Sequence, residues 1–553
     1  MNFNKVLALV IAGAFFSFKA KAQDEGRLSG NFQMDAQYYF IDSLIGAPVV
    51  PEKVLMNGFA NINYVKGNFR AGLRYESYLN TIQGFPEGYR GNGVPFRYAG
   101  YTKDELDVTV GNFYEQFGSG LILRAYEERA LGLDNAFDGI RVKYEAAPGV
   151  NLTGLIAKQR LFFTTGPGIV RAANADVFLN ELLGRTDSKN LWTIGLSGVS
   201  KYQADNDPRY NLPENVFSYS ARLGWINGNL SASAEYVHKY NDPSGDNGFA
   251  FQEGRAVMLN LGYSKKGLGV NLAFKSLDNL SFRSDRGESL NNLLINYVPA
   301  LTKQHTYNLA ATLYPYAAQP RGEFSYLAEV FYKVPRKSTL GGKYGMDIYV
   351  NYAQTLEPYR EETSQQVQDE ERVTYTNNIF KPGKEIYFQD FNIEIKKKLS
   401  KKHKLTASYI YLTYNNDISL GVIESEKEFI PKGLIRAHIG VLDFTQKINR
   451  KHSLRYEVQH LSTDQHRRNW ATAVIEYTYS PHWFVAVMDQ YNYGNPIESQ
   501  KLHYFYGSVG YIKGANRISL GYGRQRAGVF CIGGVCRQVP ASNGFTLSIT
   551  STF

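Results

Sequence analysis

Residues 543–553, NGFTLSITSTF, mostly alternate between apolar and hydroxyl-bearing side chains and end on an aromatic residue. In a β-strand, successive side chains point to opposite faces, so this segment would have one apolar face and one polar face. The apolar parity holds Phe545, Leu547, Ile549 and Phe553, and the other holds Thr546, Ser548, Thr550 and Thr552. The pattern predicts the closing strand of a membrane β-barrel, apolar toward lipid and polar toward the lumen. We expect its apolar positions to act as the C-terminal signal for barrel assembly.

The first residues have the layout of a secretory signal peptide. Lys5 precedes an apolar run at residues 6–18, and small residues precede the expected cleavage site after Ala22. The run is too short to span a bilayer. Cleavage would leave residues 23–553 as a single barrel domain in the outer membrane. The first expected strand begins near Arg27, which leaves no room for an N-terminal plug domain and disfavours a TonB-dependent receptor.

Composition agrees with a barrel. The chain has 41 Tyr, 33 Phe and 4 Trp among 553 residues, yet its mean hydropathy is on the polar side. Rich aromatics on a polar background suit alternating barrel strands, and no later apolar stretch approaches the roughly 20 residues that a spanning helix needs. The formal net charge is +10. This excess fits anionic lipid headgroups, an anion-attracting lumen or simply a solvated rim.

Alternating segments of about ten residues recur along the whole chain. Tight turns such as Asn227-Gly228 and Lys513-Gly514 alternate with long polar loops such as 202–215, 356–383 and 526–542. Short turns on one side and long loops on the other predict an up-and-down, all-β transmembrane barrel with the short side periplasmic. A count of 26 strands requires weak segments near 165–173 and 290–298, so the prediction is 24–26 strands.

One expected loop is not simply polar. Residues 111–141 mix apolar side chains with charges, and apolar residues in an exterior loop need the lumen wall to cover them. We therefore expect residues 115–137 to fold inward and narrow the pore, with a ring of charges setting its selectivity. The charged candidates are Arg124, Glu127, Glu128, Arg129, Asp134 and Asp138. The alternative is a plain β-hairpin with a short helical tip and solvated charges.

Other chemistry-bearing residues are sparse. Cys531 and Cys536 lie in the last long loop, and export to an oxidising compartment predicts a disulfide between them. His452 and His460 would share the lipid-facing side of one strand, too far apart to ligate one ion. We predict no catalytic residue, metal site or cofactor, and we do not expect an enzyme; a barrel hydrolase is the third-ranked alternative.

The block GNFYEQFGSGLILR at residues 111–124, together with LGLDNAFDG at residues 131–139, carries a family resemblance. With the Tyr- and Asn-rich strands, these motifs resemble an uncharacterised family of Bacteroidota outer-membrane barrels. The resemblance implies outer-membrane location and no functional residue. Some large barrels of that phylum serve type IX secretion, so the resemblance keeps an accessory role open.

The sequence favours a porin-like channel for small polar solutes. The alternative is a non-enzymatic accessory or scaffold component of an outer-membrane secretion or assembly complex. The expected partners are outer-membrane lipid and lipopolysaccharide, the barrel-assembly machinery and, for the alternative, secretion-system proteins; no nucleic acid partner is expected.

Overall fold

The computed structural model describes residues 26–367, 370–421, 433–532 and 535–553. Twenty-four strands form one antiparallel sheet, each strand pairing with the next, and β1 pairs with β30 to close the barrel. The strands are β1 (Arg27–Tyr39), β2 (Val54–Lys66), β3 (Phe69–Leu79), β4 (Gly91–Lys103), β5 (Leu106–Phe113), β10 (Phe137–Ala147), β11 (Val150–Leu161), β12 (Thr164–Phe178), β13 (Asn190–Tyr202), β14 (Asn215–Asn227), β15 (Leu230–Lys239), β16 (Gly254–Lys265), β17 (Leu268–Asp278), β18 (Gly322–Val334), β19 (Met346–Val367), β20 (Glu370–Lys398), β21 (His403–Asn415), β22 (Leu434–Lys447), β23 (His452–Ser462), β24 (Trp470–Tyr479), β25 (Trp483–Tyr491), β26 (His503–Lys513), β27 (Asn516–Gln525) and β30 (Ser542–Thr552). The predicted all-β, up-and-down barrel is confirmed.

Smaller elements lie between the strands. Three short hairpins lie outside the barrel sheet: β6 (Glu115–Phe117) with β7 (Leu123–Ala125), β8 (Glu127–Glu128) with β9 (Leu133–Asp134), and β28 (Gly528–Ile532) with β29 (Val535–Val539). The short helices are η1 (Ser43–Ile45), η2 (Glu87–Tyr89), η3 (Arg129–Leu131), α2 (Leu179–Leu182), η4 (Gly245–Asn247), α3 (Asn308–Leu313), α4 (Asn416–Gly421) and η5 (Glu498–Gln500). In the described parts of the chain, no helix is long and apolar enough to cross a membrane.

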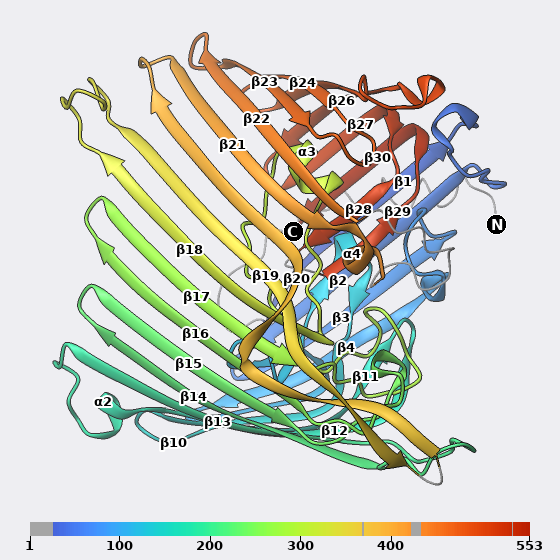
Figure 1. The fold of residues 1–553 in the computed structure, drawn as a ribbon, viewed down its shortest axis with the longest axis vertical. Coiled ribbons are helices and arrows are strands. Elements are labelled where there is room, and N and C mark those ends of the chain that lie inside the picture. Colours follow the sequence, from blue (N-terminus) through green and yellow to red (C-terminus); the bar gives the residue numbers. More distant parts are fainter. Residues whose placement is uncertain (1–25, 368–369, 422–432, 533–534) are drawn as a thin grey trace.

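The two ends of the barrel differ as the turn pattern predicts. The tight turns lie together at the end that is at the left in Figure 1. Two of them are Asn227-Gly228, between β14 and β15, and Lys513-Gly514, between β26 and β27. In each the glycine has a left-handed φ, +55° at Gly228 and +60° at Gly514, which a tight hairpin turn requires. Most of the long connections lie at the opposite end. The predicted signal peptide falls outside the described residues.

The closing strand has the predicted faces. In the register of β1 with β30, Tyr38 lies opposite Phe545 and Gln37 lies opposite Thr546. Phe545 is exposed on the outside, whereas Thr546 and Ser548 line a cavity inside the barrel. Exposed apolar side chains also recur at every second position of other strands, for example Ile140, Val142 and Tyr144 on β10. The outer surface is therefore that of a barrel that spans a membrane.

Two sequence predictions are corrected. Residues 290–298 form no barrel strand and belong to the long connection between β17 and β18, whereas the other weak segment, 165–173, lies in β12; the count of 24 is the lower end of the predicted range. The expected loop at 356–383 is largely strand: β19 and β20 keep pairing past their neighbours, from Pro358–Pro382 to Val367–Glu370. This projecting hairpin is the yellow and orange ribbon at the lower right of Figure 1.

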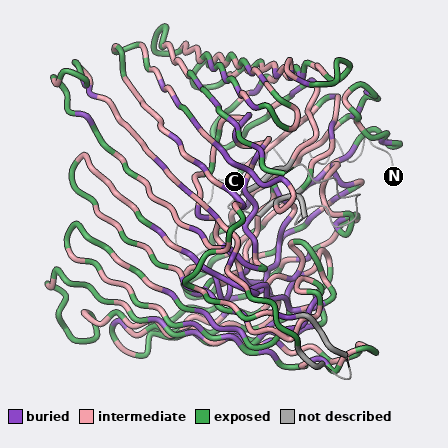
Figure 2. Tube along the Cα trace, viewed as in Figure 1, coloured by how far each residue is buried: buried purple, intermediate pink, exposed green. Residues whose placement is uncertain are grey.

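Burial is uneven along the barrel. Figure 2 shows buried residues gathered toward the end with the long connections, while the tight-turn end is mostly exposed or intermediate. The main hydrophobic cluster joins residues of the strand walls to residues of the connections after β5 and β17. The core of this protein thus lies within one half of the barrel.

Candidate functional site

Two connections pack together inside the hydrophobic cluster. We call residues 114–136 the first inward segment and residues 279–321 the second inward segment. The Arg124 amide donates to the Ile295 carbonyl at 2.8 Å, and the Tyr297 amide donates to the Gly120 carbonyl at 2.9 Å. Phe117, Leu121 and Leu123 are at most 1% exposed. They share one cluster with wall residues from β12 to β17, so the apolar side chains of the first inward segment are covered by the wall.

The candidate charges of the first inward segment make contacts within the segment, with the second inward segment and with the barrel wall. The Arg124 guanidinium lies between two rings, 4.3 Å from the centre of Tyr126 and 4.0 Å from that of Tyr297. Burial raises the pKa of Tyr126, so this hydroxyl stays neutral. Glu127 pairs with Arg129 at 2.6 Å, and the Glu128 carboxylate caps η3 by accepting the Ala130 amide.

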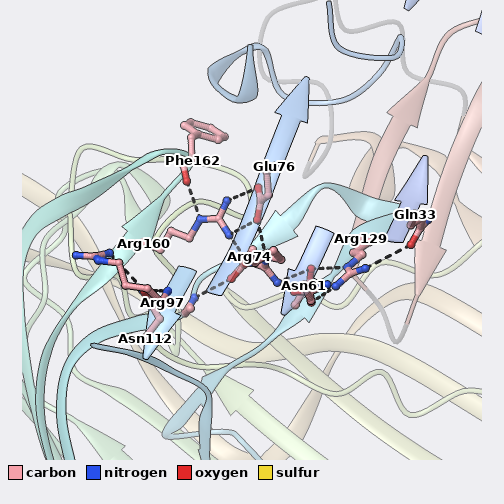
Figure 3. A network of polar contacts seen from close by, with 12 residues as sticks. Gln33, Asn61, Arg74, Glu76, Arg97, Asn112, Arg129, Arg160 and Phe162 are labelled. Atoms are coloured by element: carbon pink, nitrogen blue, oxygen red, sulfur yellow. Dashed lines mark hydrogen bonds and ion pairs between the residues drawn. The ribbon is translucent and has the colours of Figure 1, made fainter. Parts of the chain in front are cut away.

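Asp134 connects the first inward segment to the barrel wall. Its carboxylate pairs with Arg74 of β3 and Arg160 of β11, and both guanidinium groups also pair with Glu76. Figure 3 shows Arg74, Glu76 and Arg160 converging, with Arg129 beside them. Burial and the Asp134 charge raise the pKa of Tyr114, whose hydroxyl donates to the same carboxylate at 3.1 Å. Paired buried charges of this kind hold two elements in one arrangement.

Asp138 lies apart from the other five candidates. It belongs to the wall strand β10 and shares the outward parity of Ile140 and Val142. Its carboxylate pairs with Arg97 at 3.3 Å, and the Arg97 side chain is 60% exposed. The six predicted charges therefore do not form one ring, because the segment re-enters the wall at Phe137 and each later side chain alternates in direction.

The second inward segment was not predicted. Wall residues Lys275 and Glu323, both 0% exposed, form an ion pair. Lys275 also donates to the Pro299 carbonyl, and Glu323 accepts the Gln319 amide at 2.8 Å. On the far wall, Gln459 of β23 accepts the Leu309 amide at 3.0 Å. The sequence held one usable signal: apolar residues between two strands without alternation. They are Phe282, Leu293, Ile295, Val298, Leu301 and Leu309.

A third connection also reaches the other two. The β28–β29 hairpin contacts α3 of the second inward segment and η3 of the first. Its backbone register places Cys531 opposite Cys536. The side chains of residues 529–537 lie outside the described part of the chain, so the disulfide stays a prediction.

Several cavities remain in the lumen, among them one of about 660 Å³ against β14–β20 and two beside the opposite strands. A cavity of about 790 Å³ lies between the inward segments and the wall formed by β1, β2 and β25–β27. A second cavity of about 290 Å³ adjoins it and shares four lining residues: Asp35, Gln37, Ile82 and Tyr506. We call the two together the passage. Its second part reaches Arg517, near the tight-turn end of β27.

The size and polarity of the side chains that line the passage explain why it is not filled. Several side chains that point inward here are short and polar, including Ser508, Ser519, Thr546 and Ser548, although Tyr506 and Arg517 also line the passage. Small polar side chains neither fill the lumen nor attract an apolar segment, whereas larger apolar ones would do both. Within the described residues, no group of three or more His, Cys, Asp or Glu is placed to hold a metal ion.

The chain belongs to the DUF6029 family, described as a family of unknown function, whose model matches residues 2–553. A search of curated proteins found no match.

Solved structures show only distant likeness. The siderophore receptor PirA from Pseudomonas aeruginosa is 11% identical with a TM-score of 0.38, covering 96% of this chain and 81% of that one. OccK3 (OpdO) from Pseudomonas aeruginosa is 11% identical with a TM-score of 0.36, covering 78% and 94%. The P pilus usher (PapC) translocation pore is 9% identical with a TM-score of 0.40, covering 95% and 99%. At such values nothing about their activities transfers to this chain.

Proposed function

We propose that this member of the DUF6029 family is an outer-membrane channel for small polar solutes. The inward segments narrow its lumen, and solutes cross through the passage. The observation that carries this proposal is the passage itself, a space of about 790 Å³ with a mixed polar and apolar lining that adjoins one of about 290 Å³. Closing the passage would require larger side chains at Ser508, Ser519, Thr546 and Ser548 of β26, β27 and β30.

The first inward segment acts in this proposal as part of the constriction. Arg129 and Glu128 line the passage, whereas Arg124 is stacked between two tyrosines and Asp134 is tied to the wall. Only the first two are placed to meet a solute. Arg124 and Asp134 keep the segment in position, so the charges that tune selectivity are fewer than the sequence indicates.

A matched pair of serines tests the proposal. Ser548 and Ser551 lie on opposite faces of β30, and only Ser548 lines the passage. We expect the purified protein to give steady single-channel currents in planar bilayers. Ser548→Trp should lower the conductance by at least about half, because the indole fills part of a narrow passage, and Ser551→Trp should leave it unchanged. A correctly folded wild-type barrel that never conducts would refute the channel.

A second function, docking of another envelope protein, is favoured by the projecting hairpin. Its paired residues continue beyond the barrel sheet, and Phe380 on it is 69% exposed. Glu361 and Thr376 are register partners, so a two-residue turn can replace residues 362–375. If docking is the function, this shortened chain should lose envelope proteins that co-purify with the wild type, while its conductance does not change.

A further inference from the structure

Three arginines line the larger cavity of the passage: Arg129, Arg524 and Arg526. Arg129 pairs with Glu127 at 2.6 Å, and Arg524 pairs with Asp42 at 2.7 Å. Among the described residues, no carboxylate lies within ion-pair distance of Arg526. Two acids line the same cavity, and each accepts a hydrogen bond from an uncharged donor: Asp35 from the Gln33 side chain and Glu128 from the Ala130 amide.

Two hydrogen bonds hold the Arg526 side chain, but they do not use all of its N–H donors. Nη2 donates to the Thr312 hydroxyl of α3, and Nη1 donates to the Ala527 carbonyl at 3.2 Å. A guanidinium has five N–H donors, so these bonds leave three, and the buried Nε has no hydrogen-bond partner. The group lies 5.6 Å from the centre of the Trp470 ring. It is thus positioned by neutral groups from two sides, with donor capacity to spare.

Burying the positive charge of Arg526 costs free energy when the cavity holds only water. Burial and the neighbouring Arg467 lower the pKa of Arg526 to about 10, so it stays charged at neutral pH, and none of the described carboxylates compensates this charge. Buried charges in proteins are normally paired with an opposite charge or a ligand. An anion that enters the passage would supply the missing partner and relieve part of this cost.

We propose that Arg526 is the centre of an oxyanion-binding site in the passage, which selects small solutes that carry a carboxylate or a phosphate group. The planar guanidinium can donate two parallel hydrogen bonds to either group. This inference rests on the proposed function and gives the transported solutes a chemical class. Because the site has one uncompensated arginine, it binds solutes weakly enough to release them, as conduction requires.

A binding measurement tests the site without any current. Inorganic phosphate or succinate at millimolar concentration should raise the unfolding temperature of the detergent-purified chain by about 2 °C or more. Arg526→Gln should abolish the rise, and Arg526→Lys should keep part of it because the charge remains. The matched control is Arg209→Gln, which removes the same charge from an exposed loop residue paired with Asp207 and should keep the full rise.

The result that overturns the site is a phosphate or succinate shift that survives in Arg526→Gln, or no shift with either anion in the wild type. If Arg526→Gln lowers the unfolding temperature by the same amount with and without the anion, the role of Arg526 is purely structural and the site is refuted. Phosphate and succinate separate the two ligand groups: a shift with only one of them identifies which group the site takes.

Currents across a KCl gradient then separate the two proposals. The wild type should prefer chloride over potassium, and phosphate should block the current; Arg526→Gln should halve the preference and weaken the block about tenfold. Conductance without any Arg526 dependence overturns the site and leaves the channel. Anion binding that depends on Arg526 in a chain that never conducts overturns the channel and leaves the site.

Discussion

The two sides of the lumen differ in the side chains that point inward. On the packed side, β12 to β17 present Val170, Val199, Val237 and Leu277, each 0% exposed beneath the inward segments. On the open side, β26, β27 and β30 present serine and threonine to the passage. Burying a valine or leucine contributes about 1.5–3 kcal/mol, and a serine offers no comparable gain. The inward residues of β12 to β17 thus favour packing of the inward segments against that wall, whereas those of β26, β27 and β30 leave the passage beside them.

Charge follows the same division. On the packed side, Lys275 and Glu323 neutralise each other and bond the backbone of the second inward segment. On the open side, Arg526 lines the passage, and the described part of the chain supplies no carboxylate within ion-pair distance of it. Compensated charges act as structural ties and an uncompensated one is available to a solute. Charged residues in this barrel therefore anchor an inward segment on one side and are available to bind a solute on the other.

The largest expected effect comes from removing the filling of the packed side. Asp278 and Gly322 are register partners in β17 and β18, so an Asn-Gly turn can replace residues 279–321 without changing the barrel register. We expect single-channel conductance to rise several-fold, because a barrel of this strand number encloses a wide lumen when it is not filled. The shortened projecting hairpin, lacking residues 362–375, is the control and should conduct as the wild type. An unchanged conductance in a folded deletion variant would mean that the segment does not narrow the pore.

The next effect concerns the ties of the packed side. Lys275→Met leaves the buried Glu323 without its cation and should lower the free energy of unfolding by about 3–5 kcal/mol. Adding Glu323→Gln removes the stranded charge, so the double variant should recover part of the loss. On the open side, Ser519→Ala should change stability by less than about 0.5 kcal/mol. Urea denaturation in detergent measures all three, and equal losses for Lys275→Met and Ser519→Ala would erase the distinction between the sides.

The barrel could be predicted from sequence because its signal is local. The period-two alternation at 543–553 needs no knowledge of any other segment, and the Gly228 and Gly514 turns are set by neighbouring residues. The error at 290–298 has the same origin. A short apolar run such as Leu293-Leu294-Ile295 fits a buried strand and a buried connection equally well, and only its partners distinguish them.

The candidate site was only partly predictable. The inward packing of apolar residues in the first inward segment follows from their need for cover, and the same reasoning applied to Phe282 and Ile295 would have found the second. Which charges meet a solute depends on register and contacts across the barrel. Arg74 and Asp134 are 60 residues apart in the chain, and nothing local to either predicts their pairing. Arg526 lies in no sequence motif, because what distinguishes it is that no acid among the described residues is near it in space.

The smallest expected difference compares two aspartates that the sequence places in one group. Asp134 is buried against Arg74 and Arg160, whereas Asp138 pairs on the outer face with the exposed Arg97. Asp134→Asn should lower the free energy of unfolding by about 1–3 kcal/mol, because two buried guanidinium groups lose a carboxylate and keep only Glu76 and Glu127. Asp138→Asn should cost about 0.5 kcal/mol or less, since exposed ion pairs contribute little. Denaturation midpoints compare the two variants directly, and current noise should increase only in Asp134→Asn, where the first inward segment loses its tie to the wall. If Asp138→Asn were the more damaging change, the assignment of the two carboxylates to opposite faces of the barrel would be wrong.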